Sequence, residues 1–210
     1  MTFDGAVFEA REINAWRGDR HILRDVSFSV RPGEFLKVTG PNGVGKTTLL
    51  RVICGLLPAE TGELWWRGQS VRGRRDEFNF ELGHLGHLNS LKGDLTAREN
   101  LKFLAGLRTT LTAQTIDATL DRVGILSRGD LPARSLSAGQ KRRLALARLL
   151  LADAALWILD EPVTNLDTAG IRLVEELIVD HVEHGGLAIA AAHQRLLDDA
   201  PCLRRLELEP

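Results

Sequence analysis

The sequence has no tyrosine, one methionine and two cysteines, and its 210 residues contain no long uninterrupted apolar run. The longest such stretch, residues 144–159, is interrupted by Arg148 and Asp153, and it is shorter than the roughly 18–20 residues that a membrane-spanning helix needs. Cys54 and Cys202 lie far apart and neither belongs to a Cys-x-x-Cys pair. The sequence therefore supports neither a disulfide scaffold nor a zinc site.

An excess of charge is also missing, because the formal net charge at pH 7 is −1. Proteins that bind nucleic acid through their overall field carry an excess of Lys and Arg, so we expect no nucleic-acid partner. Residues 1–5 include an acidic residue and no apolar run, so we expect no signal peptide and a cytosolic chain. The length fits a single domain over residues 1–210 with a core of ordinary size.

Residues 40–48 read Gly-Pro-Asn-Gly-Val-Gly-Lys-Thr-Thr and contain the pattern Gly-x-x-x-x-Gly-Lys-Thr. An apolar-rich run at 35–39 precedes the motif and a helical run follows it, which is the strand–loop–helix context of a phosphate-binding loop. The glycines allow several backbone N–H groups to point into one concavity at the positive end of the helix dipole. Lys46 can reach the β- and γ-phosphates of a nucleotide, and the Thr47 hydroxyl can bind Mg²⁺. The nucleotide-binding residues predicted here are Gly40, Pro41, Asn42, Gly43, Val44, Gly45, Lys46, Thr47 and Thr48, the last of which also fits an ordinary first helical turn.

The second half of the site is predicted where buried strands end. The apolar run 156–159 suits a buried parallel strand and is followed directly by Asp160 and Glu161. Parallel strands deliver their last residues to the sheet edge at which the phosphate loop lies, so we expect Asp160 to hold Mg²⁺ and Glu161 to act as general base on the attacking water. A second apolar run, 187–192, ends at His193, which we expect near the γ-phosphate or that water. The alternatives are an acidic strand end at the surface and a structural histidine.

Alternating strand and helix patterns predict an α/β fold with a mainly parallel sheet. Residues 7–30 are expected to form further β structure, and residues 64–71 a hairpin. The basic run 72–75 is expected to be a solvated loop.

Residues from about 88 to 151 are expected to be helical, with one helix that begins at Ser137. Asp167 is expected to cap a further helix. His181 and His184 lie near the end of that helix, where the dipole favours basic groups, and they are expected at the surface.

In their order and spacing these motifs resemble the ATP-binding cassette (ABC) family. The matches are 40–48 with its Walker A motif, 136–140 (Leu-Ser-Ala-Gly-Gln) with its signature motif, 156–161 with its Walker B motif, 165–167 with its D-loop and His193 with its switch histidine. The resemblance covers almost the whole chain. It implies a P-loop ATPase with an N-terminal antiparallel β subdomain and a helical subdomain over about residues 88–150. It also implies a head-to-tail homodimer around two ATP molecules, in which one protomer's Ser137, Gly139 and Gln140 contact the other's ATP.

Two residues depart from the family pattern. Trp16 stands where the family usually has a tyrosine that stacks on adenine; an indole offers the same π-face, and a sheet-packing aromatic is the alternative. His87 stands where the family usually has a glutamine near Mg²⁺ and the attacking water, so this contact would depend on pH. The predicted catalytic residues are Glu161, His193, His87 and Lys46, and the predicted Mg²⁺ ligands are Thr47, Asp160 and His87.

Three segments together resemble one branch of the family, the ATP-binding subunit of the haem exporter complex in bacterial cytochrome c maturation. They are Leu-Gly-His at 85–87, the signature motif followed by Lys-Arg-Arg, and Leu-Trp-Ile-Leu-Asp-Glu-Pro at 156–162. The resemblance implies a peripheral ATPase on the cytoplasmic face of the inner membrane that acts on haem or a haem–chaperone complex. Integral-membrane permease subunits would be its partners, and an apolar groove around residues 88–105 is expected to dock them. The alternatives are a short ABC transporter with another cargo and a soluble ABC ATPase without a transport role.

Overall fold

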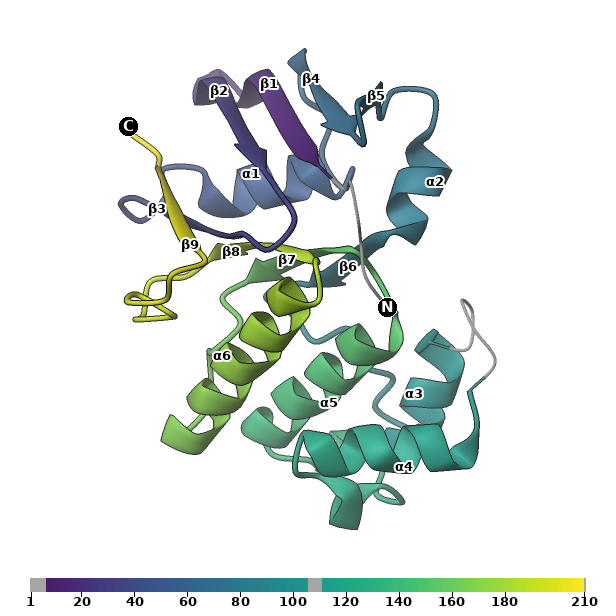
Figure 1. Ribbon diagram of the computed structural model, residues 1–210. Helices are drawn as coiled ribbons and strands as arrows, with labels where there is room; N and C mark the ends of the chain where they lie inside the picture. The colour runs from purple at the N-terminus through teal and green to yellow at the C-terminus, as the bar shows by residue number, and fades with distance from the viewer. Residues whose placement is uncertain (1–6, 106–110, 210) are drawn as a thin grey trace.

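The computed structural model describes residues 7–105 and 111–209, which form two sheets and several helices arranged in layers (Figure 1). The antiparallel sheet has the order β2-β1-β4-β5 and contains β1 (Phe8–Arg17), β2 (Arg20–Val30), β4 (Thr61–Trp66) and β5 (Gln69–Ser70). The parallel sheet has the order β6-β7-β8-β3-β9 and contains β6 (Leu82–Leu85), β7 (Leu156–Asp160), β8 (Leu187–Ala191), β3 (Phe35–Thr39) and β9 (Leu203–Glu207). The predicted α/β fold, with a parallel sheet and an N-terminal antiparallel one, is confirmed.

Helices cover both faces of the parallel sheet (Figure 1). Helix α1 (Lys46–Ile53) lies between the two sheets, and the larger helices pack on the opposite face of the parallel sheet. The remaining helical segments are α2 (Arg75–Phe80), α3 (Ala97–Ala105), α4 (Ala113–Arg122), α5 (Ala138–Leu151) and α6 (Thr168–Glu183), with short 3₁₀ turns η1 (Leu126–Arg128) and η2 (Ala133–Ser135).

The strand residues explain how the layers pack. In β8, Leu187, Ile189 and Ala191 belong to the core on the α1 side, whereas Ala188 and Ala190 belong to the core on the side of α5 and α6. Successive strand residues point to opposite faces, and small side chains on one face let helices approach closely. All five residues of this strand are buried, as expected for a parallel sheet covered on both faces.

The basic run at 72–75 is not wholly a solvated loop, so that prediction was wrong at Arg75. This residue begins α2, and its Nη2 donates to the Ile53 carbonyl at 2.8 Å. The last carbonyls of a helix lack partners within the helix, and a guanidinium can satisfy them. Arg75 therefore closes the end of α1 that lies away from the phosphate loop.

The predicted helical region starts later than expected, at Ala97. Residues 88–96 form a loop that is organised by Asn100, which is fully buried. The Asn100 side chain accepts from the Lys92 backbone N–H at 2.8 Å and donates to the carbonyls of Lys92, Leu95 and Thr96. In a helix these backbone groups would bond to each other. In the loop the side-chain amide of Asn100 bonds to them instead.

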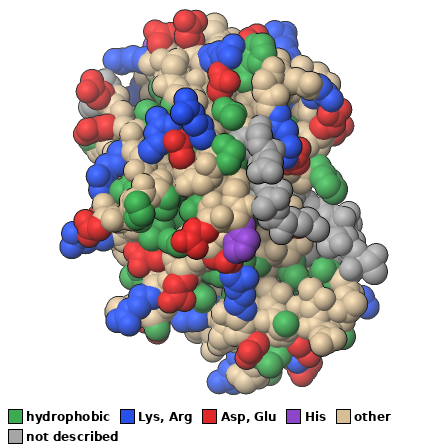
Figure 2. All heavy atoms as spheres, viewed as in Figure 1, with side chains coloured by type: hydrophobic (Ala, Val, Ile, Leu, Met, Phe, Trp, Pro, Cys, Tyr) green, Lys and Arg blue, Asp and Glu red, His purple; other side chains and the backbone are tan. Residues whose placement is uncertain are grey.

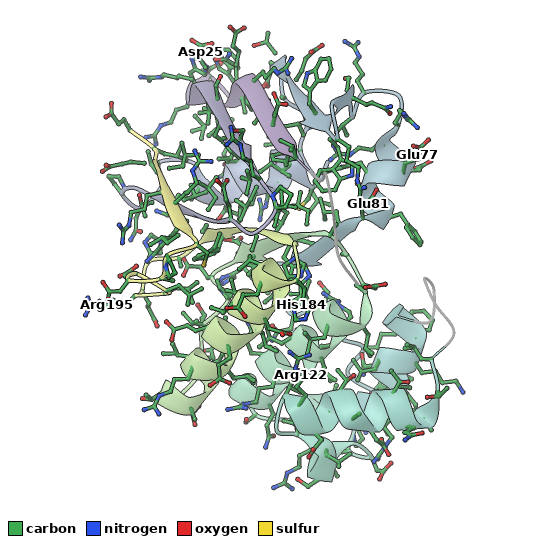
Figure 3. All side chains as sticks on the ribbon, in the orientation of Figure 1. Asp25, Glu77, Glu81, Arg122, His184 and Arg195 are labelled. Atoms are coloured by element: carbon green, nitrogen blue, oxygen red, sulfur yellow. The ribbon has the colours of Figure 1, made fainter. Side chains whose placement is uncertain are left out.

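His181 is buried rather than exposed, so its predicted surface position was wrong. The imidazole stacks on Trp157 with ring centroids 4.0 Å apart, and Nε2 lies 3.2 Å from the Leu187 carbonyl oxygen. Burial lowers the pKa of His181 to about 4. His181 is buried because it follows the buried Ile178 by three positions and therefore lies on the same face of α6. His184, labelled in Figure 3, is exposed as predicted.

The surface mixes both signs of charge. On the face shown in Figure 2, basic and acidic side chains are interspersed, in keeping with the net charge of −1. One ion pair of this surface, Arg122 with Asp180 at 2.6 Å, joins α4 to α6 (Arg122 is labelled in Figure 3). Among residues 7–105 and 111–209, none of the helices has the length and apolarity required to cross a bilayer.

Candidate nucleotide-binding site

The phosphate loop connects β3 to α1 and depends on glycine at both ends. Gly40 has a φ of 133° and Gly45 a φ of 119°. A Cβ at Gly40 would lie 2.5 Å from the Leu208 carbonyl oxygen, and a Cβ at Gly45 would lie 2.8 Å from Cγ2 of Ile22. A side chain at either position would therefore clash and hold a disfavoured backbone. The sequence places glycine where the loop closes against its neighbours.

Lys46 lies inside this loop. Its Nζ donates to the carbonyls of Gly40 at 2.6 Å and Pro41 at 2.9 Å, and the residue is 6% exposed. Burial lowers the pKa of Lys46, and the nearby Glu161 carboxylate opposes that shift. Its ammonium is therefore fixed in the loop that would enclose the phosphates.

Thr47 and Asp160 meet at the edge of the parallel sheet. They are 113 positions apart in the sequence, yet the Thr47 hydroxyl donates to Oδ1 of Asp160 at 3.1 Å. Asp160 ends β7 and is 5% exposed. Within the described residues no group of three or more His, Cys, Asp or Glu side chains could hold a metal alone. These two oxygen donors suit Mg²⁺, which usually completes its octahedral shell with water and substrate phosphates.

Glu161 and His193 are also brought together. Oε1 of Glu161 lies 3.3 Å from Nε2 of His193, and Oε2 accepts from the His193 backbone N–H at 3.4 Å. The Glu161 backbone N–H donates to the Ala191 carbonyl at 2.8 Å. The ends of β7 and β8 therefore place the predicted base and the predicted switch histidine in contact.

The segment that follows His193 is anchored to β3, an inner strand of the parallel sheet. Lys37 of β3 is 5% exposed, and its Nζ lies 2.6 Å from Oδ1 of Asp198 and 3.1 Å from the Gln194 carbonyl oxygen. The hydrogen bond from Lys37 lowers the pKa of the Asp198 carboxyl. This buried cation holds the switch segment against the strand that feeds the phosphate loop.

Trp16 is the penultimate residue of β1 and remains 37% exposed. One face of its indole is covered by His21, with centroids 3.7 Å apart and planes 4° from parallel. Nε2 of His21 lies 2.8 Å from Oδ1 of Asn14, which fixes the imidazole. A cavity of about 80 Å³ separates this strand pair from the phosphate loop, and its lining includes His21, Pro41, Asn42, Gly43 and Val44. His21 therefore borders the phosphate loop, and the partly exposed Trp16 stacks on it.

His87 lies in the exposed turn after β6. Two neighbours in that turn are held by Arg142 of α5, whose Nη1 donates to the Gly86 carbonyl at 2.8 Å and to Oδ1 of Asn89 at 3.1 Å. Arg142 also reaches the end of β7, where Nη2 donates to the Glu161 carbonyl at 2.7 Å. Sequence reasoning missed Arg142, because an arginine inside a Lys-Arg-Arg run of a helix is usually solvated.

The signature segment starts α5 with a reciprocal cap. The Ser137 hydroxyl accepts from the Gln140 backbone N–H at 3.2 Å, and Oε1 of Gln140 accepts from the Ser137 backbone N–H at 3.0 Å. A Cβ on Gly139 would lie 3.0 Å from the Asn165 carbonyl oxygen, so the signature segment packs closely on the predicted D-loop. Ser137 itself is exposed, on a surface that a second molecule can reach.

Comparison with known proteins identifies the family of this site. The model of the family described as "ABC transporter" matches residues 23–164. The chain belongs to the ABC transporter family. As an ABC ATPase it binds ATP, and the resemblance inferred from its motifs is confirmed.

Relatives of this ABC ATPase share one name. The "Cytochrome c biogenesis ATP-binding export protein CcmA" of Vibrio vulnificus is 40% identical over 203 residues, which cover 96% of this chain and 99% of the relative. CcmA of Nitrosococcus oceani is 48% identical over 182 residues, or 86% of this chain and 82% of the relative. CcmA 2 of Cupriavidus metallidurans is 45% identical over 192 residues, or 91% of each chain. The expected resemblance to the cytochrome c branch is confirmed.

Solved structures agree on the fold. One described as an ATP-binding subunit of an ABC transporter has a TM-score of 0.82 at 21% identity, and covers 97% of this chain and 88% of its own. The cbiO1 protein of Clostridium perfringens, part of the ABC transporter complex cbiONQ, has a TM-score of 0.77 at 25% identity and covers 97% and 86%.

Proposed function

We propose that this ABC ATPase is the ATP-hydrolysing subunit of a cytochrome c biogenesis exporter and couples hydrolysis to the release or export of haem or a haem–chaperone complex. The observation that carries the proposal is the similarity to CcmA proteins along nearly the full length of both chains. The whole of residues 1–210 would act as a single ATP-binding domain, with the helices between about 88 and 150 as a helical subdomain.

The site supports a division of roles among its residues. The backbone of residues 40–48 and the Lys46 ammonium would hold the phosphates, and Trp16 would stack on adenine. Thr47 and Asp160 would hold Mg²⁺, with His87 close to its shell, and the ion would neutralise charge on the β- and γ-phosphates. Glu161 would take a proton from water as the water oxygen bonds to the γ-phosphorus. The bond from the γ-phosphorus to the β–γ bridging oxygen would break, and ADP would leave with that oxygen. His193 would orient the carboxylate and this water.

Completion of the site requires a second protomer. Ser137, Gly139 and Gln140 would contact the ATP that is held by the partner's phosphate loop, and the two-fold pair would enclose two ATP molecules. The exposure of Ser137 supports this arrangement, because the motif is open to another chain.

Coupling to transport requires integral-membrane permease subunits at the cytoplasmic face of the inner membrane. Large apolar side chains are exposed on the segments around β6, with Leu88 at 78% in the β6–α3 connection, Phe103 at 47% on α3 and Phe80 at 62% at the end of α2. Contiguous exposed apolar patches are typical of docking surfaces, and Leu88 and Phe103 lie within the segment 88–105 where the groove is expected. We infer that the permease binds here and that the chain is peripheral to the membrane.

The decisive experiment is a pull-down of the tagged full-length chain from solubilised native membranes, with the co-purified subunits identified by mass spectrometry. Cytochrome c maturation membrane proteins in the eluate would support the proposal. Permease subunits of another transporter would contradict the haem assignment and leave the ATPase assignment intact. A Phe103→Asp variant tests the docking surface, because it should reduce recovery of the permease and preserve ATP binding.

A further inference from the structure

Arg142 is a buried cation that contacts the loops of the proposed hydrolytic site. None of the roles proposed above includes it. It is the fifth residue of α5 and is 3% exposed. Nε donates to the Pro162 carbonyl at 3.0 Å, and Nη2 donates to the carbonyls of Asp160 at 2.9 Å and Glu161 at 2.7 Å. Nη1 donates to the Gly86 carbonyl and to Oδ1 of Asn89 in the turn after β6. Each of the five N–H donors of the guanidinium therefore has an acceptor.

These contacts join three segments that are distant in the sequence. Asp160 ends β7 and is followed by Glu161 and Pro162, Gly86 and Asn89 flank His87, and α5 begins at the signature motif. Each segment carries one part of the proposed hydrolytic site. The side chain of Arg142 therefore connects the signature helix directly to the two loops that would face the γ-phosphate in the proposed site.

The Glu161 backbone shows why such a connection is needed. Its φ of 49° lies in the left-handed region, which non-glycine residues rarely adopt. A conformation of this kind persists only where the surroundings hold it. Here the N–H is held by the Ala191 carbonyl at 2.8 Å and the carbonyl is held by Nη2 of Arg142.

The acceptor set also indicates that arginine is specifically required. All five acceptors are carbonyl or amide oxygens, so no carboxylate side chain neutralises the cation through a direct hydrogen bond. Burial lowers the pKa of Arg142 to about 10, against the opposing charges of Asp160 and Glu161. A lysine ammonium, with three donors on one nitrogen, cannot span five acceptors that lie around a planar fork.

We propose that Arg142 is a positioning residue for hydrolysis: it holds the Glu161 backbone and the His87 turn in fixed relation to the signature helix, so that ordering of this helix at the partner's nucleotide orients the general base. The inference rests on the proposed role of Glu161. It assigns Arg142 no contact with ATP.

The test compares purified full-length variants for ATP affinity, kcat and unfolding midpoint. Arg142→Gln and Arg142→Lys should keep ATP affinity within about threefold and lower kcat by about 100-fold, as expected when a catalytic group is displaced by about 1 Å. Arg148→Gln is the matched control. Arg148 lies on the same helix and donates to the carbonyls of Ser90 and His84, but has no bond to residues 160–162. This control should keep kcat within about threefold even if it lowers the midpoint.

Asn89→Ala provides a second route if the Arg142 variants fold poorly, because it removes one acceptor at the edge of the cluster. It should lower kcat several-fold without a change in ATP affinity. Normal kcat in Asn89→Ala, or in a folded Arg142→Gln, would overturn the inference. Glu161→Gln in the same assay separates the role of Glu161 from the role of Arg142. Normal ATP hydrolysis by Glu161→Gln would show that the proposed general base is wrong. An inactive Glu161→Gln together with a fully active Arg142→Gln would refute only the role of Arg142.

Discussion

Glu161, the proposed general base, has a backbone conformation that few non-glycine residues adopt. Its φ is 49°, and its side chain is in contact with His193. Strained backbone of this kind clusters at active sites, so the conformation of Glu161 directly after β7 supports its proposed chemical role. The Glu161 carboxylate would provide the chemistry, and the conformation of the Glu161 backbone sets the direction of that side chain.

Glu161→Gln should therefore bind ATP with near-normal affinity and hydrolyse it about 100- to 10,000-fold more slowly, because an amide of the same size cannot accept a proton as a general base. Phosphate release at saturating Mg-ATP measures the rate, and calorimetry measures the affinity. Glu63→Gln, in β4, is the control and should have normal kcat. A rate within threefold of wild type would show that another group removes the proton.

His181 should make stability depend on pH. Its pKa is lowered to about 4, whereas an unfolded histidine titrates near 6.5. Between these values the unfolded chain binds more protons, so the stabilisation is complete above about pH 6.5 and is lost as the pH falls toward 4. The wild-type chain should lose about 2 kcal/mol from this group between pH 7 and pH 5.

Urea unfolding at these two pH values provides the measurement. His181→Phe keeps a ring on Trp157 and removes the titration, so its loss of stability should be smaller by the same amount. The exposed His184, three positions later, is the matched site, and His184→Phe should behave as wild type. Equal pH dependence in His181→Phe and wild type would contradict the assignment.

At the scale of elements, α5 and α4 each begin with a hydroxyl cap but have different expected roles. Ser137 caps α5 by accepting from the Gln140 backbone N–H, and Thr112 caps α4 by accepting from the Thr115 backbone N–H. Both caps satisfy a backbone donor that the first turn leaves unpaired. Only α5 begins with the signature motif, so only its cap is expected to serve catalysis as well.

Ser137→Ala and Thr112→Ala should each lower the free energy of unfolding by about 1 kcal/mol. Ser137→Ala alone should lower kcat by about 100-fold, because it removes a hydrogen-bond donor to the partner's nucleotide. Denaturant unfolding and phosphate release measure the two effects. Equal kcat in both variants would mean that Ser137 acts only as a cap.

At the scale of the whole molecule, the proposed site would be divided between two chains. The phosphate loop, Asp160 and Glu161 meet at one sheet edge of a protomer, whereas Ser137 is exposed toward a partner. A closed pair with two-fold symmetry would complete both sites at once. ATP should therefore favour the dimer, and hydrolysis should release it.

Glu161→Gln in Mg-ATP should form a stable dimer, with twice the protomer mass of 23.2 kDa by light scattering. It should be monomeric with ADP, and adding Lys46→Ala should keep it monomeric in ATP because the phosphates lose their cation. A Glu161→Gln chain that binds ATP and stays at the protomer mass would contradict the shared site.

The sequence alone determined the phosphate loop, the acidic strand end and the caps at Ser137 and Asp167, because these depend on residues that are neighbours in the chain. It also determined the alternation of strand and helix, since each element shows its own period. Tertiary structure decided the rest. The Thr47–Asp160 bond spans 113 positions, Arg142 is buried among carbonyls from two distant loops, and His181 lies against Trp157. These contacts depend on which strands pair and which face each helix presents to the core, and no local pattern carries that information.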